Sequence, residues 1–326
     1  MYIKLFSYLC TLNLDYSTYM CIHMRKRATV ILCFIATMVL PLSASKLFPD
    51  EYHFISLWGS AGYSSLLHNS TEIKAGPGFA PSIGVGYRYY HTGFIMQLGV
   101  EGQYALWTNK LNTSSLTMNM RDTEGDVFEM KASVNESKDR MHAVNVNIPI
   151  LFGYEYHRLY FLAGVGAGLN VWAQTSSHSS VTTMGDYERY IDPFVDMPNH
   201  GFTRGKSVDS EKYDVQMNLN LMLHAEIGAR VDEVFKEKGA DVPKHKYRMY
   251  VAAFADYGVL NVHKNKDFGQ ALSYKETAEG LQFYVVPAMV SSQLYNKRVT
   301  PLTIGVKFTV LFELPKPKVC LMCREN

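Results

Sequence analysis

Few residues of this chain have the types and spacing of a chemical site. His178 lies among serines, and His200 lies near Asp196, so a serine nucleophile with a histidine base is conceivable in both places. No nucleophile motif frames either histidine, and polar loops carry such residues as ordinary surface. We therefore expect no catalytic residue and no enzyme activity. The serines beside His178 are Ser176, Ser177, Ser179 and Ser180.

Two other pairs have the spacing of metal ligands or redox groups. His224 and Glu226 would point the same way on a strand, and two residues separate Cys320 from Cys323. A zinc site needs about four ligands, and the chain offers no second cysteine pair beside this one. We expect a hydrogen-bonded histidine and either a disulfide loop or an idle cysteine pair. Neither a metal nor a cofactor is predicted.

The composition limits which elements can position these residues. The chain has 326 residues, of which 47% are hydrophobic, and a formal net charge of +2. No apolar stretch after residue 45 reaches the length of about 18 residues that a membrane helix needs. The near-neutral charge and the lack of a basic stripe argue against nucleic acid as a partner.

An export signal precedes the rest of the chain. Residues 25–27 are basic, residues 28–40 are apolar, and residues 43–45 are small enough for cleavage. We expect residues 1–23 to be an upstream extension, with a genuine amphipathic segment as the alternative, and residues 24–45 to be a signal peptide. The folded body is expected over 46–313 and a tail over 314–326. Cys10, Cys21 and Cys33 precede the cleavage point, so the body contains no cysteine.

Apolar and polar residues alternate with a period of two in eight segments after residue 50, which indicates strands. The longest alternation runs from Val215 to Val231. Strands of soluble sandwiches average about 5–6 residues, whereas a membrane strand needs about 9–11 and can continue above the lipid. A bilayer cannot satisfy a free sheet edge, so the sheet must close. The other segments cover residues 55–63, 79–89, 94–104, 144–154, 161–171, 247–257 and 302–312.

The pattern predicts an all-β fold, a transmembrane antiparallel up-and-down barrel of about eight strands. Short connections alternate with long ones, as in outer-membrane barrels with short periplasmic turns and long extracellular loops. Ten strands are the alternative, because Leu281 to Val290 is apolar, although Pro287 interrupts it. The alternation of apolar and polar residues continues in the same phase over residues 116–120 and 128–132. This predicts a hairpin that continues strands three and four beyond the membrane.

Three segments resemble a known family. Val146–Tyr154 and Leu159–Gly168 look like paired strands of the porin-like, OmpA-type outer-membrane barrels common in Bacteroidetes, and Gly305–Phe312 looks like their closing strand. The resemblance implies an outer-membrane location in a Gram-negative cell envelope, with lipid, lipopolysaccharide and the outer-membrane assembly machinery as partners. It also implies that the final strand is the assembly signal, with Val310 and Phe312 at the membrane edge.

Alternation places a set of charged side chains on the inward face of the barrel. Isolated charges in a narrow lumen are costly, so we expect pairs, with Glu226 near Arg248 and Asp256 near Lys307. An eight-stranded barrel has room only for its own side chains, which predicts a lumen filled by polar groups. The predicted lumen charges are Arg88, Glu101, Glu226, Arg230, Arg248, Asp256 and Lys307.

The function expected from these features is a structural or surface-interaction role. The long extracellular loops would meet the environment, with a host surface or a polysaccharide as the possible ligand. A narrow pore for small solutes is the alternative, favoured by the polar inner face and opposed by the small number of strands. An outer-membrane lipid-modifying enzyme is the less favoured third possibility.

Overall fold

The computed structural model describes residues 51–71, 73–111, 114–122, 124–197, 202–232, 247–264, 270–277, 280–291 and 297–315. The predicted extension, the signal peptide, His200, Cys320 and Cys323 lie outside these residues. No helix in the described part of the chain is long and apolar enough to cross a membrane.

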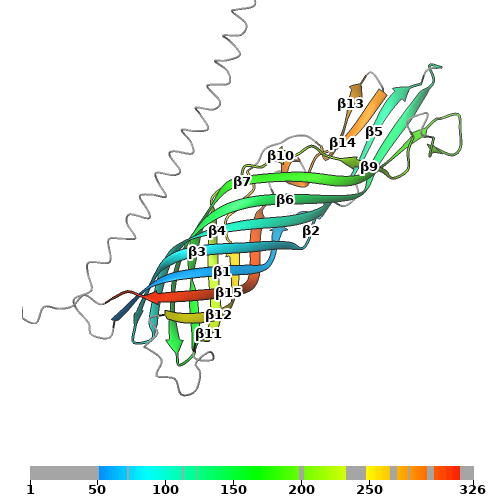
Figure 1. Ribbon diagram of the computed structural model, residues 1–326. Helices are drawn as coiled ribbons and strands as arrows, with labels where there is room; N and C mark the ends of the chain where they lie inside the picture. Colours follow the sequence, from blue (N-terminus) through cyan, green and yellow to red (C-terminus); the bar gives the residue numbers. More distant parts are fainter. Residues whose placement is uncertain are drawn as a thin grey trace, which may run out of the picture. The chain divides into compact units, whose positions relative to one another are not determined.

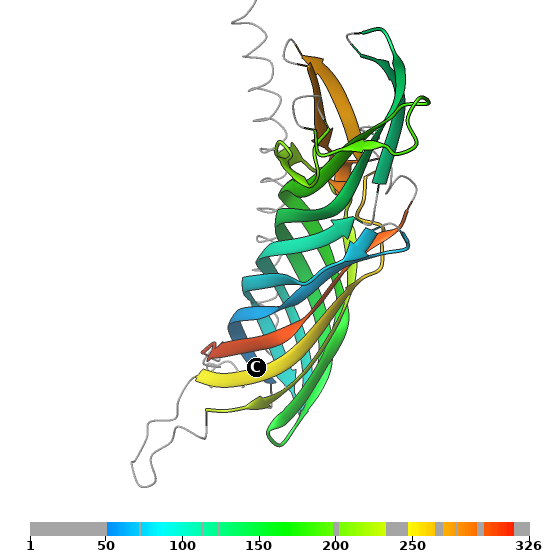
Figure 2. The same ribbon diagram turned by 90° about the vertical axis from the view of Figure 1, so that its right-hand side faces the viewer.

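Eight antiparallel strands close into a barrel (Figures 1 and 2). Each strand pairs with the next ring strand along the chain, and the last pairs with the first, so the topology is up-and-down. The predicted all-β barrel of eight strands is confirmed. In ring order the strands are β1 (Glu51–His68), β3 (Gly78–His91), β4 (Phe94–Leu111), β6 (Val127–Tyr156), β7 (Leu159–Asp186), β11 (Asn220–Arg230), β12 (Tyr247–Gly258) and β15 (Val299–Glu313).

Two sequence predictions about strand limits are corrected. The alternation from Val215 does not form one strand, because β11 begins at Asn220 while Val215 and Met217 pack among buried apolar side chains. The segment from Leu281 to Val290 contributes no ring strand. It divides into β14 (Gly280–Val285), which pairs with β13 (Leu272–Thr277) outside the ring, and the 3-10 helix η3 (Ala288–Val290), which follows Pro287.

The outer surface of the ring is an apolar belt. Outward residues such as Ile83, Val165 and Phe308 are 75%, 43% and 46% exposed, whereas their inward neighbours are buried or half-buried. On β4 the belt extends from Phe94 to Tyr104, the length with which a tilted strand crosses a bilayer. The next exposed outward positions on β4 and β6 include charged residues, namely Lys110, Lys138 and Arg140, which set the upper limit of the belt.

The barrel has two unlike ends. At one end, tight turns join β3 to β4 through Thr92 and Gly93, and β6 to β7 through His157 and Arg158. Thr92, Gly93 and His157 have φ values of 46°, 92° and 58°, the left-handed backbone of tight turns. We call this the short-turn end. The opposite end carries the long connections and is called the long-loop end.

At the long-loop end, β6 and β7 continue well past the ring. β5 (Ser114–Arg121) pairs with β6 on one side, and β9 (Lys206–Asp209) pairs with β7 on the other. The predicted hairpin over residues 116–132 is thereby confirmed. Hairpin β13–β14 packs on this sheet through Leu272, Val285 and Phe283. We call the four strands and the covering hairpin the loop module. The short strands β2 (Ile73–Ala75), β8 (Phe194–Val195) and β10 (Tyr213–Asp214) pair with β4, β7 and β7, respectively.

Candidate functional site

The lumen is filled in layers, and the lowest, at the short-turn end, combines aromatic rings with two arginines. Arg248 lies over the rings of Tyr52, Phe54 and Tyr90, at 5.6, 4.8 and 5.3 Å from their centroids. Arg88 lies over two further rings and donates two hydrogen bonds to Gln97. Cation–π contacts of this kind stabilise a cation, and more strongly where water is excluded.

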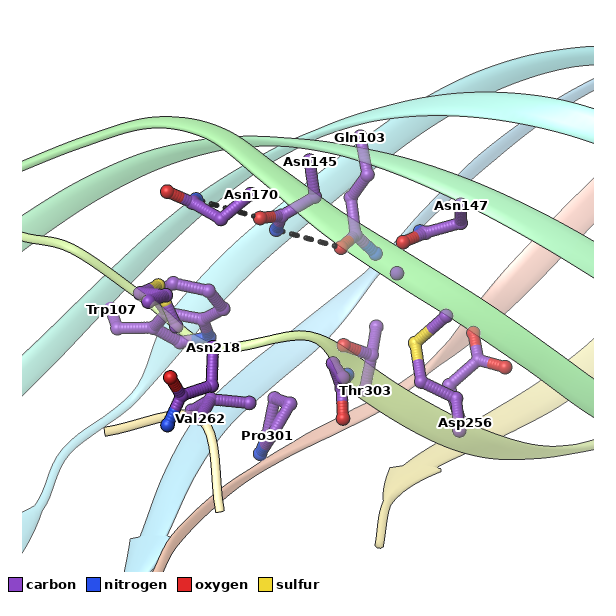
Figure 3. A pocket seen from close by; sticks show the side chains of 14 residues that line it. Gln103, Trp107, Asn145, Asn147, Asn170, Asn218, Asp256, Val262, Pro301 and Thr303 are labelled. Carbon is purple, nitrogen blue, oxygen red and sulfur yellow. Dashed lines mark hydrogen bonds between the residues drawn. The ribbon is translucent and has the colours of Figure 1, made fainter. Parts of the chain in front are cut away.

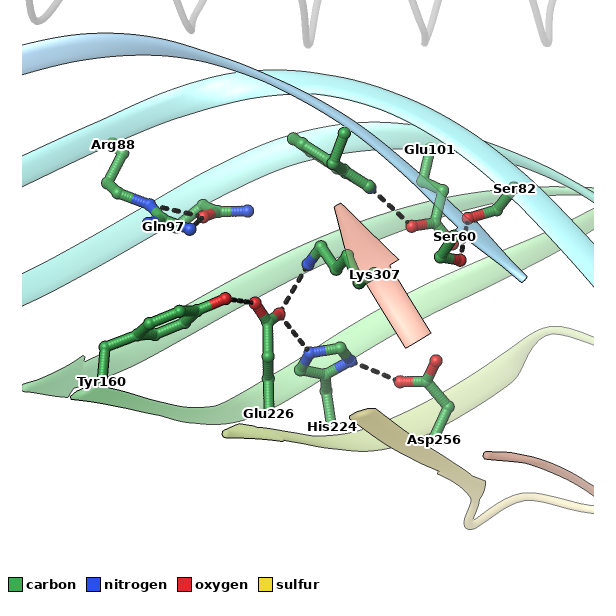
Figure 4. A network of polar contacts seen from close by, with 11 residues as sticks. Ser60, Ser82, Arg88, Gln97, Glu101, Tyr160, His224, Glu226, Asp256 and Lys307 are labelled. Atoms are coloured by element: carbon green, nitrogen blue, oxygen red, sulfur yellow. Dashed lines mark hydrogen bonds and ion pairs between the residues drawn. The ribbon is translucent and has the colours of Figure 1, made fainter. Parts of the chain in front are cut away.

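A network of charged side chains lies above this layer (Figure 4). Glu226 is fully buried and accepts hydrogen bonds from Lys307 Nζ at 2.6 Å, from His224 Nε2 at 3.2 Å and from the Tyr160 hydroxyl. His224 Nδ1 lies 2.5 Å from Asp256 Oδ1. Both ring nitrogens of His224 therefore face carboxylate oxygens, which matches the imidazolium form because it donates from both.

The predicted partners within this network are wrong, although the charges do pair. Glu226 bonds Lys307 where Arg248 was expected, and Asp256 bonds His224 where Lys307 was expected. The reason is the strand register, which places Glu226 opposite Phe254 and Lys307 opposite Ala252. Equal distances from a connecting turn therefore do not bring residues to equal heights.

The two other predicted lumen charges lie at different heights. Glu101 accepts hydrogen bonds from Trp58 Nε1 at 2.7 Å and from Asn147 at 3.3 Å, next to the central network (Figure 4). Arg230 lies at the short-turn end of β11, where its guanidinium is 3.8 Å from Glu155 and 3.3 Å from Asp232. All seven predicted charges are thus held by described partners or by rings.

Amide side chains form the next layer toward the long-loop end (Figure 3). Asn170 donates to Asn145 Oδ1 at 2.9 Å, and Asn145 donates to Gln103 Oε1 at 3.4 Å. Trp107 and Asn147 line the same cavity, together with residues of β11, β12 and β15 such as Asn220, Asp256 and Thr303, and its volume is 30 Å³. A second cavity, beside Lys307 and His224, has a volume of 20 Å³. Each has room for about one or two water molecules.

An apolar plug closes the top of the lumen. Residues 286–291 turn into the mouth of the barrel, where Ala288, Met289 and Val290 pack against strand residues such as Trp107 and Met141. Asp139 Oδ2 accepts a hydrogen bond from the backbone N–H of Ala288 at 2.6 Å, and His263 Nε2 lies 3.1 Å from the Met289 carbonyl oxygen. Burial raises the pKa of the Asp139 carboxyl, and the hydrogen bonds that it accepts oppose this effect.

His178 and its neighbouring serines, which were expected in a polar loop, lie in strand β7, where the strand pleat separates them. Ser177 and Ser179 are buried and bond Ser137, whereas His178 is exposed on the other face of β7 and bonds Asp209 at 2.5 Å. In the described part of the chain, no serine hydroxyl bonds His178. Among the same residues, no three His, Cys, Asp or Glu side chains are grouped to hold a metal ion.

A cavity larger than the two in the lumen lies outside it. An open groove with a volume of 720 Å³ runs between β9 with the segment that follows it and hairpin β13–β14. Its size falls within the range of about 300–1,000 Å³ typical of ligand sites. Sequence reasoning missed this groove, because its walls come from loop segments without periodicity. The only sequence signal was the tyrosine content of those segments, including Tyr213, Tyr274 and Tyr284.

Comparisons with known proteins give no family for the chain. No protein-family model and no curated protein sequence matches it. Among solved structures, it is similar to the attachment invasion locus protein Ail of Yersinia pestis, crystallised with the heparin analogue sucrose octasulfate (10% identity, TM-score 0.24, 80% of this chain and 99% of that one). It is also similar to the outer membrane protease OmpT of Escherichia coli (6%, 0.27, 83% and 100%) and to the translocator domain of the autotransporter NalP of Neisseria meningitidis (8%, 0.21, 88% and 96%).

Proposed function

We propose that this protein is an outer-membrane surface-interaction protein, in which a closed barrel anchors the loop module outside the cell. The observation that carries the proposal is the contrast between the two lumen cavities, of 30 and 20 Å³, and the groove of the loop module, of 720 Å³. The apolar belt supports the membrane location, because exposed outward residues such as Ile83 and Val306 would be costly in water.

The sidedness of the proposal follows from the two ends of the barrel. Outer-membrane barrels have short periplasmic turns and long external loops, so the short-turn end would face the periplasm. The loop module would then face the medium, in contact with lipopolysaccharide at its base. Lys110, Lys138 and Arg140 lie just above the belt, where cations can pair with anionic lipid headgroups.

A surface role is tested by removing part of the loop module while the barrel is kept. Cells would carry the full protein or a variant in which Leu272–Val285 is replaced by a Gly/Ser linker. Retention of the cells on host-cell layers and on immobilised polysaccharide would be measured. We expect the full protein to increase retention above that of cells lacking it, and the variant to lose the increase. Equal retention of cells with and without the protein would contradict the proposal.

A narrow pore for small solutes is the second candidate. The layer of amide side chains around Asn145 and Asn170 supports it, because a polar wall favours the passage of small polar solutes. The apolar plug and the network around Glu226 oppose it, since both would have to move before a solute could cross. Neither of these two candidate functions includes a catalytic role. His178 and Asp209 form an exposed pair whose ordinary role is a surface hydrogen bond.

We also infer that the final strand guides assembly in the outer membrane. β15 pairs with both β1 and β12, and Phe312 lies outward on the belt opposite Ile55 and Tyr247. The double variant Val310→Asp, Phe312→Asp should lose heat-modifiable protein from the membrane fraction. A chain truncated after Phe312 should assemble normally. Normal membrane levels of the double variant would refute the inference.

A further inference from the structure

The groove of the loop module has fixed walls. One wall is β9 with the segment that leads to Tyr213, and the other is hairpin β13–β14. β9 pairs with β7 from Lys206 to Asp209, and Ser210 exchanges hydrogen bonds with the backbone of Ser177. The hairpin is held by Leu272 and Val285, which are buried against the sheet. A site with such walls does not have to be ordered by its ligand.

Aromatic rings are the first chemical feature of the groove. Tyr274 and Tyr284 on the hairpin are 43% and 41% exposed, and Tyr213 and Phe283 are half-buried in the walls. Burial, followed by the negative charge of Glu211, raises the pKa of Tyr213. Exposed ring faces bind apolar faces of a ligand, and tyrosine hydroxyls add hydrogen bonds at the ring edges.

Unpartnered polar side chains are the second feature. The side chains of Lys206, Lys275 and Gln282 line the groove and make no hydrogen bond or ion pair with another described residue. Asp209 and Glu211 add two carboxylates, so the two lysines are balanced by two acids. Donors and acceptors are both offered, while the net charge of the lining is zero. A polyanion would meet repulsion from the acids as well as attraction from the lysines.

We propose that this groove binds a neutral oligosaccharide segment. A neutral sugar ring combines an apolar C–H face with hydroxyls that donate and accept hydrogen bonds, and both parts have partners in the groove. The exposed rings of Tyr274 and Tyr284 supply stacking surfaces, and Gln282, Lys206 and Lys275 supply hydrogen bonds. This inference rests on the proposed surface role and names its ligand class and its residues.

The first experiment screens the purified protein, in a detergent without a sugar headgroup, on a printed array of oligosaccharides. The array carries neutral chains beside sulfated and uronate-bearing chains. The proposal expects at least one neutral chain to be retained. Retention of acidic chains alone, or of no chain, would overturn it.

The second experiment assigns the retained neutral chain to the groove by calorimetric titration. Tyr274→Ala and Tyr284→Ala should each weaken binding by about tenfold or more, as expected for the loss of an aromatic anchor. Tyr156→Ala is the matched control, because Tyr156 is also exposed but lies at the short-turn end. Tyr284→Phe should bind better than Tyr284→Ala because it keeps the ring. Unchanged affinity in both alanine variants would place the sugar elsewhere and overturn the proposal.

Cell retention separates the failure of this inference from the failure of the proposed function. Cells that carry Tyr274→Ala with Tyr284→Ala would be compared with cells that carry the linker variant of the hairpin. If the linker variant loses retention while the double tyrosine variant keeps it fully, the surface role stands and the glycan groove is refuted. If both lose it while heat modification stays normal, both proposals are supported.

Discussion

Strand β7 lines both the lumen and the groove, and polar side chains behave differently in the two regions. In the lumen, Glu226 accepts hydrogen bonds from three side chains, and the two cavities have volumes of only 30 and 20 Å³. In the groove, the side chains of Lys206, Lys275 and Gln282 have no partner among the described residues, and the volume is 720 Å³. Polar groups that satisfy one another hold a structure together, whereas polar groups left free on fixed walls are available to a ligand.

This comparison between lumen and groove predicts that the largest loss of folding stability follows from a substitution at the centre of the lumen. Lys307→Ala would leave the fully buried Glu226 without its lysine partner, and breaking a buried pair costs about 3–5 kcal/mol. Urea unfolding in lipid vesicles, followed by tryptophan fluorescence, measures this loss. The combined variant Lys307→Met, Glu226→Leu should be less destabilised than Lys307→Ala, because no unpaired charge remains. A cost below 1 kcal/mol for Lys307→Ala would show that this pair does not hold the lumen together.

A smaller, local effect is expected at the plug. Asp139→Ala removes the acceptor of the Ala288 N–H, and a buried donor left unsatisfied costs about 1–3 kcal/mol. Hydrogen exchange read by mass spectrometry should show faster exchange over residues 286–291 and unchanged exchange in β12 and β15. If exchange in the plug is unaffected, the carboxylate does not anchor it.

The same carboxylate predicts a pH dependence. Burial raises the Asp139 pKa in the folded state, so its contribution to stability is fully present below the unfolded-state pKa and is lost as pH rises through the folded-state pKa. After correction for the intrinsic exchange rate, protection of the plug should therefore fall as pH increases from about 4 upward. Asp139→Asn should flatten this dependence. If the hydrogen-exchange protection of the plug rises with pH in the wild type, the Asp139 pKa is lowered in the folded state and the prediction is wrong.

The smallest change in folding stability is expected for a substitution on the solvent-exposed face of the loop module. Lys131 lies 2.7 Å from Asp186 and 3.0 Å from Glu129, and its side chain is 40% exposed. Exposed ion pairs contribute little to stability, because solvent screens their charges. Lys131→Ala should thus change urea stability far less than Lys307→Ala does, and added salt should reduce the difference further. Similar costs for the two lysines would abolish the proposed distinction between the regions.

The outward and inward faces of the strands could be predicted from the sequence because parity alone decides them. Ile83 is exposed and Arg88 is buried, as the alternation requires. The partners of Glu226 could not be predicted, since they depend on the stagger between β11, β12 and β15, which alternation leaves open. Whether the apolar segment from Leu281 to Val290 forms a ring strand could not be decided from the sequence for a similar reason. Pro287 marks an end of pairing, but only the fold shows that the next residues enter the barrel.

The groove was beyond sequence reasoning because its residues come from two connections that are far apart in the chain. Tyr213 lies in the connection between β7 and β11, and Tyr284 lies in the connection between β12 and β15. The two residues come close only in the folded chain, where the first connection packs along β7 next to hairpin β13–β14. Neither segment has a periodic pattern or a known motif. Long-range packing of loops, such as that of Phe283 against the sheet, therefore determines a site that no local signal marks.

Conductance across a planar lipid bilayer tests the central claim, a closed barrel below a binding module, most directly. The purified protein would be inserted from detergent at neutral pH and recorded over long periods at moderate voltage. We predict a flat baseline without regular steps, because the aromatic floor, the charged network and the plug each fill the lumen. Regular, reproducible single-channel steps from the folded wild-type protein would contradict the account and favour the narrow pore.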